Sequence, residues 1–485
     1  MTPAVQDIPR HKTAIGRATL SRPVKLALAD GLIDPQTPLF DYGCGHGDDL
    51  RLLSAMGYSG DGWDPVHRPA AALAPAPVVN LGYVVNVIED PTERQQTLRR
   101  AWELAKRVLI VSARLTAEST LMSKAAAYAD GYVTSWGTFQ KLFEQNELKT
   151  WIDQALGTAA VPAGPGVFYA FRDPDERATF VASRYRRHIV VPRLTRSVDR
   201  FEEHKPLLQS LMDFFAARGR LPDADELPET AAVISALGSL KRAFRLIQSA
   251  TGAEAWAEIA AKRAQDLLIY LALARFERRP ALGQLPLALQ RDIRGLFQSY
   301  AQACKQADTL LFSVGKTEEV NAACSHSSIG KKTPEALYVH VSATDQLPAS
   351  LRVFEGCARA YIGRVEGANI VKLSRLEPRI SYLTYPTFED DPHPALVQSL
   401  SVHLQTFRVR TRDYSDFRNP PILHRKETFL PADHPLQGKF ARLTASEESK
   451  GLLGVGNRIG TRNQWEQVLA EKGLTLRGHR LIARR

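Results

Sequence analysis

The alternation of apolar and polar segments in the first third of the chain predicts strands that alternate with helices. Strands are predicted at residues 38–40, 60–64, from 78 onward, 108–112 and 164–171. A helical pattern opens at Pro91, a favourable residue in a first helical turn, and residues 139–143 also have helical spacing. The strand–helix–strand–helix order favours a parallel sheet with crossover helices. We therefore predict a Rossmann-like α/β domain over residues 1–175.

The rest of the chain has a different pattern. Residues 176–330 are helical in character, with amphipathic stretches at 207–215 and 264–276. From residue 331 the pattern becomes mixed α+β, and strands are predicted at 336–341 and 379–385. We therefore predict three domains, over residues 1–175, 176–330 and 331–485.

The turn after the first predicted strand combines an acid with three glycines. It contains Asp41, Gly43, Cys44, Gly45 and Gly47. Glycines at alternate positions let the backbone pass close to a ligand, because none has a Cβ. The following helix N-terminus offers N–H groups to a carboxylate, and the acid can accept from an ammonium group. These features suit S-adenosylmethionine, and the pattern resembles the first motif of Rossmann-like methyltransferases.

A second acid supports this interpretation. Asp64 ends the second predicted strand, 23 positions after Asp41, where a carboxylate commonly binds ribose hydroxyls. The alternatives are an Asp–Pro turn with Pro65 and an NAD site, although the dinucleotide fingerprint spaces its last glycine differently. Residues 65–77 are too few for a full helix and strand, so the usual third strand is expected to be reduced or absent.

The third predicted strand supplies candidate catalytic residues. Asn80 and Tyr83 lie where amino-methylating enzymes place an Asn-Pro-Pro-Tyr motif. Asn80 could accept a hydrogen bond from a target amine, and Tyr83 could stack on a flipped base. The alternative is a buried strand with a satisfied asparagine. Near the N-terminus, His11 and Lys12 could reach the site or a phosphate, or could form an exposed basic segment.

The chain carries a net charge of +11, which favours acidic partners and nucleic acid above all. Two arginine-rich segments have aromatic residues between the charges, as in surfaces that stack bases. The alternative is a solvated basic surface. The candidate nucleic-acid contacts are Arg184, Arg186 and Arg187 in the first segment and Arg408, Arg410, Arg412, Arg425 and Lys426 in the second.

Composition points to a cytoplasmic protein without membrane spans. No apolar run approaches the ~20 residues of a transmembrane helix, and the first residues lack the apolar core of a signal peptide. Four scattered cysteines do not form a disulfide framework. Cys324 and His326 lie close together, but no other cysteine has zinc-finger spacing to them, so no metal site is expected.

Several segments together resemble the DNA phosphorothioation-associated methyltransferase family. They are residues 10–15, the glycine turn at 41–47, residues 80–83 and 86–90, and residues 422–427. The resemblance implies a bacterial protein that works with a DNA modification and restriction system, beside other proteins of that system. It leaves the methyl acceptor open. We therefore predict an S-adenosylmethionine-dependent methyltransferase acting on or with DNA. A non-catalytic cofactor-binding sensor and an RNA methyltransferase are the alternatives.

Overall fold

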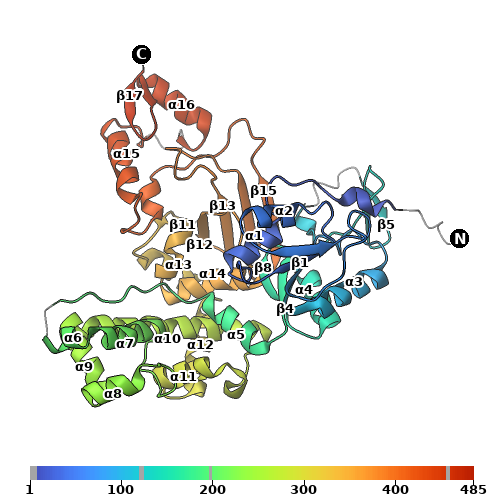
Figure 1. Cartoon of the computed structure of the whole chain (residues 1–485). Coiled ribbons are helices and arrows are strands. Elements are labelled where there is room, and N and C mark those ends of the chain that lie inside the picture. Colours follow the sequence, from blue (N-terminus) through green and yellow to red (C-terminus); the bar gives the residue numbers. More distant parts are fainter. Residues whose placement is uncertain (1–7, 119–124, 196–198, 455–458, 485) are drawn as a thin grey trace. The chain divides into compact units, whose positions relative to one another are not determined.

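The computed structural model describes residues 8–118, 125–195, 199–454 and 459–484. Contacts divide the chain into two compact units. The first contains residues 1–174, 324–346 and 357–485, and the second contains residues 175–323 and 347–356. Figure 1 colours the elements of both along the sequence. The three-domain prediction stays a prediction, although one boundary of the contact division also falls near Asp175.

A six-stranded sheet forms the centre of the N-terminal part of the first unit. Its order is β2-β1-β3-β4-β9-β8. The first four strands pair in parallel, whereas β9 is antiparallel to both β4 and β8. The strands are β1 (Leu39–Tyr42), β2 (Gly60–Trp63), β3 (Ala76–Gly82), β4 (Ala105–Ser112), β8 (Val161–Gly164) and β9 (Val167–Phe171). The predicted α/β class with a mostly parallel sheet is confirmed.

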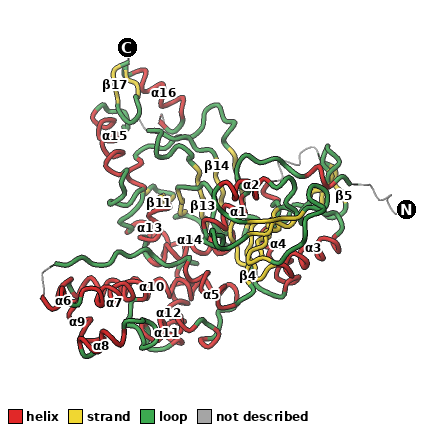
Figure 2. The backbone as a smooth tube through the Cα atoms, in the orientation of Figure 1, coloured by secondary structure: helices red, strands yellow, loops and turns green. Residues whose placement is uncertain are grey.

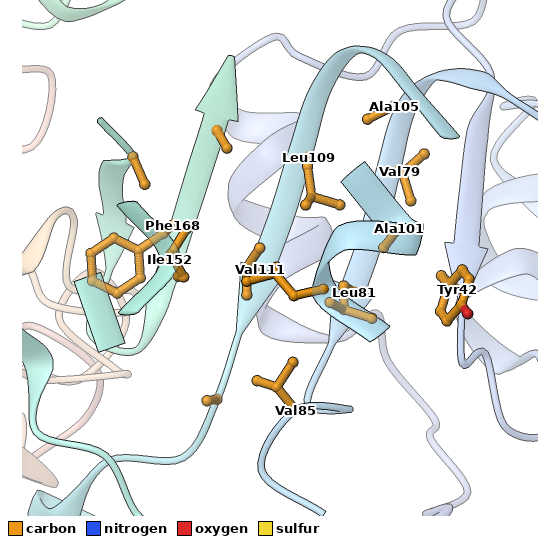
Figure 3. Close-up of a cluster of buried hydrophobic side chains, with 14 of the residues drawn as sticks. Tyr42, Val79, Leu81, Val85, Ala101, Ala105, Leu109, Val111, Ile152 and Phe168 are labelled. Carbon is orange, nitrogen blue, oxygen red and sulfur yellow. The ribbon is translucent and has the colours of Figure 1, made fainter. Parts of the chain in front are cut away.

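Alternation along the strands explains how this sheet packs. Phe40, Val79, Leu109 and Phe168 belong to one buried cluster with side chains of the helices α3 (Pro91–Leu104) and α4 (Gln145–Leu156). Figure 3 shows Leu109 and Val111 beside Ala101 and Leu81 in this cluster. Helix α1 (Arg22–Ala29) contacts β3 and β4, and α2 (Asp48–Ala55) contacts β2. In both helices, buried residues recur every three to four positions, as in a helix with one face against the core.

Two sequence expectations concern the edges of this region. Residues 65–75 contain no strand, so β2 ends the sheet and the reduced third strand is confirmed. The helix predicted at residues 139–143 is wrong. Phe139–Gln140 forms strand β7, which pairs with β6 (Gly131–Val133), and β6 pairs with β5 (Ala126–Tyr128). Phe139 and Phe143 are both buried, so their helix-like spacing reflects the burial of a short strand and the residues after it, and not a helix.

The second unit is helical, as predicted for most of residues 176–330. Figure 2 shows its helices as red segments joined by loops. Phe215, Phe244 and Trp256 pack against one another in its core, with ring centroids 4.3 to 5.5 Å apart. The helices are α5 (Pro174–Ser183), α6 (Asp199–Glu203), α7 (Lys205–Arg218), α8 (Thr230–Leu237), α9 (Leu240–Thr251), α10 (Ala253–Leu273), α11 (Leu287–Leu296), α12 (Tyr300–Ser313) and α13 (Thr317–His326), with 3-10 turns η3 (Ala274–Glu277) and η4 (Leu282–Gln284).

The C-terminal part is mixed, and its main feature is an antiparallel sheet of order β10-β11-β12-β13-β14-β15. Predicted strands at 336–341 and 379–385 correspond to β11 and β13. The strands are β10 (Lys331–Lys332), β11 (Ala336–His340), β12 (Ile370–Ser374), β13 (Arg379–Thr384), β14 (Gln398–His403) and β15 (Arg408–Asp413), followed by β16 (Leu474–Leu476) and β17 (Leu481–Ala483) as a separate hairpin. The helices are η5 (Val341–Gln346), α14 (Ala349–Ile362), η6 (Lys426–Phe429), α15 (Gln437–Ser449) and α16 (Arg462–Glu471).

Among the described residues, no helix combines the length and the apolar character that crossing a membrane requires.

Candidate functional site

A pocket of about 340 Å³ opens at the carboxyl ends of β1 and β3. Its lining includes residues of the glycine turn after β1 and of the N-terminal segment. The end of β2 adds Trp63 and Asp64, and the end of β3 adds Asn80, Gly82, Tyr83 and Val84. Strand β1 lies between β2 and β3, so the chain leaves it to one side and later returns to the other. In open parallel sheets, this reversal of strand order is where ligands bind.

The glycine turn has the backbone shape that the sequence predicts. Gly43, Gly45 and Gly47 have φ of 83°, 54° and 76°, a region that favours glycine. The N–H groups of Gly43 and Cys44 donate to the carbonyl of Trp63, at 2.7 and 3.1 Å. A Cβ on Gly43 would lie 2.5 Å from Cγ2 of Val84, and one on Gly45 would lie 3.2 Å from Cβ of Ala14. The turn is therefore packed closely against its neighbours at Gly43 and Gly45.

Cys44 lies in this turn and lines the pocket. Burial raises the pKa of its thiol to about 11, so the thiol stays protonated at neutral pH. Its Sγ donates weakly to the carbonyl of Gly45, 3.8 Å away. Cys44 thus contributes a small neutral side chain to the pocket wall.

Asp41 is the acid at the end of β1, and only 5% of it is exposed. Its Oδ1 accepts a hydrogen bond from Nδ2 of Asn80, at 2.8 Å. Burial, reinforced by the nearby charge of Asp49, raises the pKa of the Asp41 carboxyl to about 7, and the Asn80 bond partly offsets that rise. A cation that reached this carboxyl would favour its ionised form.

Asp64 forms a turn and also touches the glycine loop. Its Oδ1 accepts from the N–H groups of Val66 and His67, at 2.9 and 2.8 Å, and its Oδ2 accepts from the N–H of Gly45, at 3.1 Å. The Asp–Pro turn considered as an alternative is therefore present. A carboxylate has about four lone-pair directions, so three backbone bonds leave room for a further donor.

The two candidate catalytic residues have different environments. Asn80 is only 2% exposed, and its Oδ1 has no hydrogen-bond partner among the described residues. Tyr83 is half-buried, lines the pocket and has φ of 61°, which is rare for a bulky residue. Its N–H lies 3.0 and 3.1 Å from the carbonyl and hydroxyl oxygens of Ser112. Asn80 thus supports Asp41, whereas Tyr83 presents a ring to the pocket.

The N-terminal segment forms a wall of the pocket that sequence reasoning did not resolve. Arg10, in η1 (Arg10–Thr13), pairs with Glu89 and Glu93 at 2.7 and 2.6 Å. Farther along, the N–H of Arg17 donates to Asp48 and the N–H of Ser21 donates to Asp49. His11 lines the pocket and Lys12 does not, and both residues are exposed, so the sequence's two alternatives each hold in part. The acids in the first turn of α2 are thus used to hold this segment.

The first arginine-rich segment is only partly exposed, and its contact with nucleic acid stays a prediction. The side chain of Arg187 is 11% exposed and bonds to Asp266 at 2.7 Å, so the expected surface position of Arg187 is wrong. Arg186 is exposed but lies 3.6 Å from the buried carboxylate of Asp292. The guanidinium of Arg184 lies 4.5 Å from the ring centroid of Phe180. In this helical unit, buried carboxylates form ion pairs with arginine side chains, because a buried carboxylate needs a partner.

In the second segment, the expected strand face is present. Arg408, Arg410 and Arg412 are exposed at alternate positions of β15, which ends its sheet. Side chains at alternate positions of a strand share one face, so the three guanidinium groups form the row that the sequence predicts. Arg412 also lies over the rings of Tyr414 and Phe417, at 4.9 and 5.6 Å.

The nucleic-acid contact predicted at Lys426 is also wrong. It is only 2% exposed, and its Nζ donates to the carbonyls of Phe388 and Asp391, at 2.7 and 2.6 Å. Such a lysine cannot contact a phosphate, because its ammonium is already bonded inside the protein. Its neighbour Arg425 is half-buried and pairs with Glu448.

Comparison with known proteins finds similarity to solved structures only. No protein-family model matches the chain, and no curated protein sequence matches it. A structure of magnesium protoporphyrin IX methyltransferase (ChlM) from Synechocystis PCC 6803 with bound SAH has 15% identity to the chain. The match covers 34% of this chain and 93% of that chain, with a TM-score of 0.25. Neither the sequence identity nor the TM-score is high enough to transfer a function, so function has to be argued from the residues of the pocket.

Proposed function

We propose that the chain is an S-adenosylmethionine-dependent methyltransferase whose cofactor lies in the pocket at the ends of β1 and β3. The glycine turn carries this proposal, because it contains three left-handed glycines, two of which (Gly43 and Gly45) line a pocket where strand order reverses. Two further observations fit the cofactor. The turn leaves no space for a Cβ on Gly43, and the buried Oδ1 of Asn80 in the pocket wall has no partner among the described residues.

The charge around the turn favours this cofactor over a dinucleotide. Asp41, Asp48, Asp49 and Asp64 line the pocket in or next to the turn and its helix, whereas the arginines of the lining (Arg10, Arg17 and Arg100) come from other segments. The ammonium and sulfonium groups of S-adenosylmethionine outweigh its single carboxylate, whereas the pyrophosphate of NAD is anionic. Like charges at short range repel, so carboxylates at these positions oppose a pyrophosphate.

In this site Asp41 would bind the amino group, Asp64 the ribose, and the glycine turn the main body of the cofactor. The cofactor would supply an electrophilic methyl group on a sulfonium. The acceptor's lone pair would form the new bond to this carbon, while the electron pair of the carbon–sulfur bond stays on sulfur and a neutral thioether leaves. The protein aligns the acceptor and excludes water from it. Asn80 holds Asp41 in place through their 2.8 Å hydrogen bond. Tyr83 offers its ring to a planar acceptor such as a base.

We further propose that the acceptor is held on DNA, in the setting of phosphorothioation-linked modification, with other proteins of that system as partners. The exposed arginine row on β15 supports contact with a polyanion. The resemblance of residues 10–15 and 422–427 to the phosphorothioation-associated family supplies the biological setting.

A non-catalytic sensor is the second candidate, and one observation favours it. Asn80, whose Oδ1 was proposed to accept from an acceptor amine, is only 2% exposed, and its Nδ2 is held by Asp41. A protein that binds the cofactor and DNA without transfer needs no such group. Enzyme and sensor therefore differ in turnover and agree on cofactor binding.

The test is transfer of a labelled methyl group from S-adenosylmethionine to DNA, RNA and partner proteins, with the labelled atom identified. The methyltransferase proposal expects label in DNA and loss of transfer in Tyr83→Ala, with cofactor affinity unchanged. Tyr132→Ala is the matched control, because Tyr132 is an exposed tyrosine that does not line the pocket. Label in RNA alone would identify the RNA enzyme. Saturable cofactor binding without transfer to any substrate, partners included, would identify the sensor.

A further inference from the structure

Three buried side chains in the C-terminal part bring metal-binding atoms together. His393 lies between β13 and β14, His424 precedes η6, and Glu447 lies in α15, which Figure 1 labels near the C-terminal end. Their exposed fractions are 5%, 8% and 0%. One ring nitrogen from each histidine and one carboxylate oxygen lie within 4.8 Å of one another. Two imidazoles and a carboxylate form a donor set typical of zinc and related ions.

The other ring nitrogen of each histidine meets a backbone carbonyl. Nδ1 of His393 is 3.2 Å from the carbonyl oxygen of Leu423, and Nε2 of His424 is 2.7 Å from that of Ile459. A carbonyl oxygen can only accept, so these nitrogens carry the protons. Metal-bound histidines usually have such a partner, which fixes the tautomer and orients the ring. The lone pairs in a neutral cluster therefore lie on Nε2 of His393 and Nδ1 of His424.

Hydrogen bonds alone leave this cluster incomplete. Nε2 of His393 lies 2.7 Å from Oε1 of Glu447, which would suit an ion pair if His393 were doubly protonated. That pair still leaves Nδ1 of His424 and Oε2 of Glu447 without partners among the described residues. Two orphaned acceptors in a buried site are costly, and an ion is one of the few groups that would satisfy both.

We propose that His393, His424 and Glu447 bind a divalent transition-metal ion, with zinc as the expected metal. Zinc takes imidazole nitrogen and carboxylate oxygen at about 2.0–2.2 Å, so tetrahedral ligand atoms lie about 3.3 Å apart. The 2.7 Å between His393 and Glu447 therefore has to widen by roughly 0.6 Å on binding. A small ligand such as water would complete the four-coordinate shell.

The cluster lies beside a small apolar core. The ring of Trp465, in α16, stands edge-on to both imidazoles, with centroids 4.6 and 4.8 Å away. Trp465 belongs to a small apolar core with Ile422, Leu452, Val468 and Leu469. A metal ion here would tie two loops and α15 beside this core. Small cores gain most from such a link, because they bury little apolar surface.

The experiment is metal analysis of the full-length, untagged chain purified without chelators. About one zinc per chain is expected, falling to near zero in His424→Ala and in Glu447→Gln. His434→Ala is the matched control and should keep its metal, because His434 lies in the same part of the chain but outside the cluster. Removing zinc with a chelator should lower the melting temperature of the wild type and leave that of His424→Ala unchanged.

A second measurement uses the wild type alone, in case the variants do not fold. Replacement of zinc by cobalt should give the visible spectrum of a nitrogen–oxygen site, without the charge-transfer band of thiolate ligands. Iron in place of zinc, lost in the same variants, would support the site and correct the metal. A thiolate band, metal content unchanged in His424→Ala, or no uptake of added zinc by the metal-free protein would overturn the proposal.

Discussion

The glycine-turn pocket and the histidine cluster are two polar sites built in opposite ways. The pocket depends on the backbone of the turn, since six consecutive residues from Asp41 to His46 line it and two of them, Gly43 and Gly45, have no side chain. The cluster is made of side chains from three segments, 31 and 23 positions apart along the chain, from His393 to His424 and from there to Glu447. A backbone site should be destroyed by adding a Cβ, whereas a side-chain site should be destroyed by removing a donor atom.

The largest effect is expected from Gly43→Val. Its Cβ would lie 2.5 Å from Val84, a stiff β-branched residue, at a φ of 83°. We expect a loss of about 100-fold or more in affinity for S-adenosylmethionine, measured by calorimetry, which is about 2.7 kcal/mol. Gly57→Val is the matched control, because Gly57 has φ of 84° and nothing within 4 Å of its added Cβ.

Gly43→Val also tests whether the glycine-turn pocket and the histidine cluster are independent of each other. Gly43→Val should keep the metal content of the wild type, and His424→Ala should keep cofactor affinity. Equal loss of cofactor binding in the Gly57 control would show that the effect is backbone strain and not the shape of the turn.

Asp64→Ala should have a smaller effect. It removes the carboxylate that accepts from Gly45, Val66 and His67, and with it the proposed ribose contact. We expect a loss of about 1–3 kcal/mol in cofactor binding, or roughly 5- to 150-fold. Titration of adenosine beside S-adenosylmethionine tests the assignment, because a ribose contact predicts that both lose affinity. Unchanged adenosine binding would leave Asp64 as a turn residue only.

The pH dependence of binding tests Asp41. Burial raises its pKa to about 7, so the carboxyl gains a proton as the pH falls through 7 and can then no longer attract an ammonium group. Affinity should rise with pH and level off above 7, with a change of at most about tenfold per pH unit below it. Asp41→Asn should bind weakly with a flat profile. A flat profile in the wild type would contradict the assignment.

The free energy of unfolding should change with pH in the opposite direction to the affinity for the cofactor. The folded state binds more protons at Asp41 than the unfolded state between its ordinary pKa of 3.8 and about 7. The contribution of Asp41 to the free energy of unfolding therefore falls as the pH rises across this window. Asp41→Asn should remove that trend, which denaturant unfolding at several pH values can measure.

The smallest effect is expected at a surface that belongs to neither site. Replacing Arg408, Arg410 and Arg412 by Gln should flatten the salt dependence of DNA binding, with the log–log slope falling by up to about 2.7. The control changes the same charge elsewhere, at the exposed residues Lys241, Arg242 and Arg245 of α9. Equal loss in both triple variants would mean that net charge, and not the strand, attracts the DNA.

The sequence predicts what depends on neighbours along the chain. Apolar runs locate β1, β3 and β4, and the glycine spacing predicts the turn whose three positive φ angles the structure contains. Asp64 was singled out as well, but its bonds to three backbone N–H groups follow from how the turn folds on the loop.

Features that depend on distant partners could not be predicted. Arg10 meets Glu89 across 79 positions, and Arg187 meets Asp266 across 79 positions, so neither pairing has a local signal. Lys426 has the appearance of a surface cation in the sequence, yet two carbonyls bind it inside the fold. The histidine cluster was missed for the same reason, since no metal-ligand spacing links its three members.

The central claim, that the glycine-turn pocket binds S-adenosylmethionine, is tested most directly by photolabelling with an azido analogue and mapping the labelled peptides. The account predicts saturable labelling, displaced by S-adenosylmethionine, on peptides that contain the glycine turn, the Asp64 turn or Tyr83. Labelling confined to residues 331–485, or the absence of any displaceable label, would contradict it.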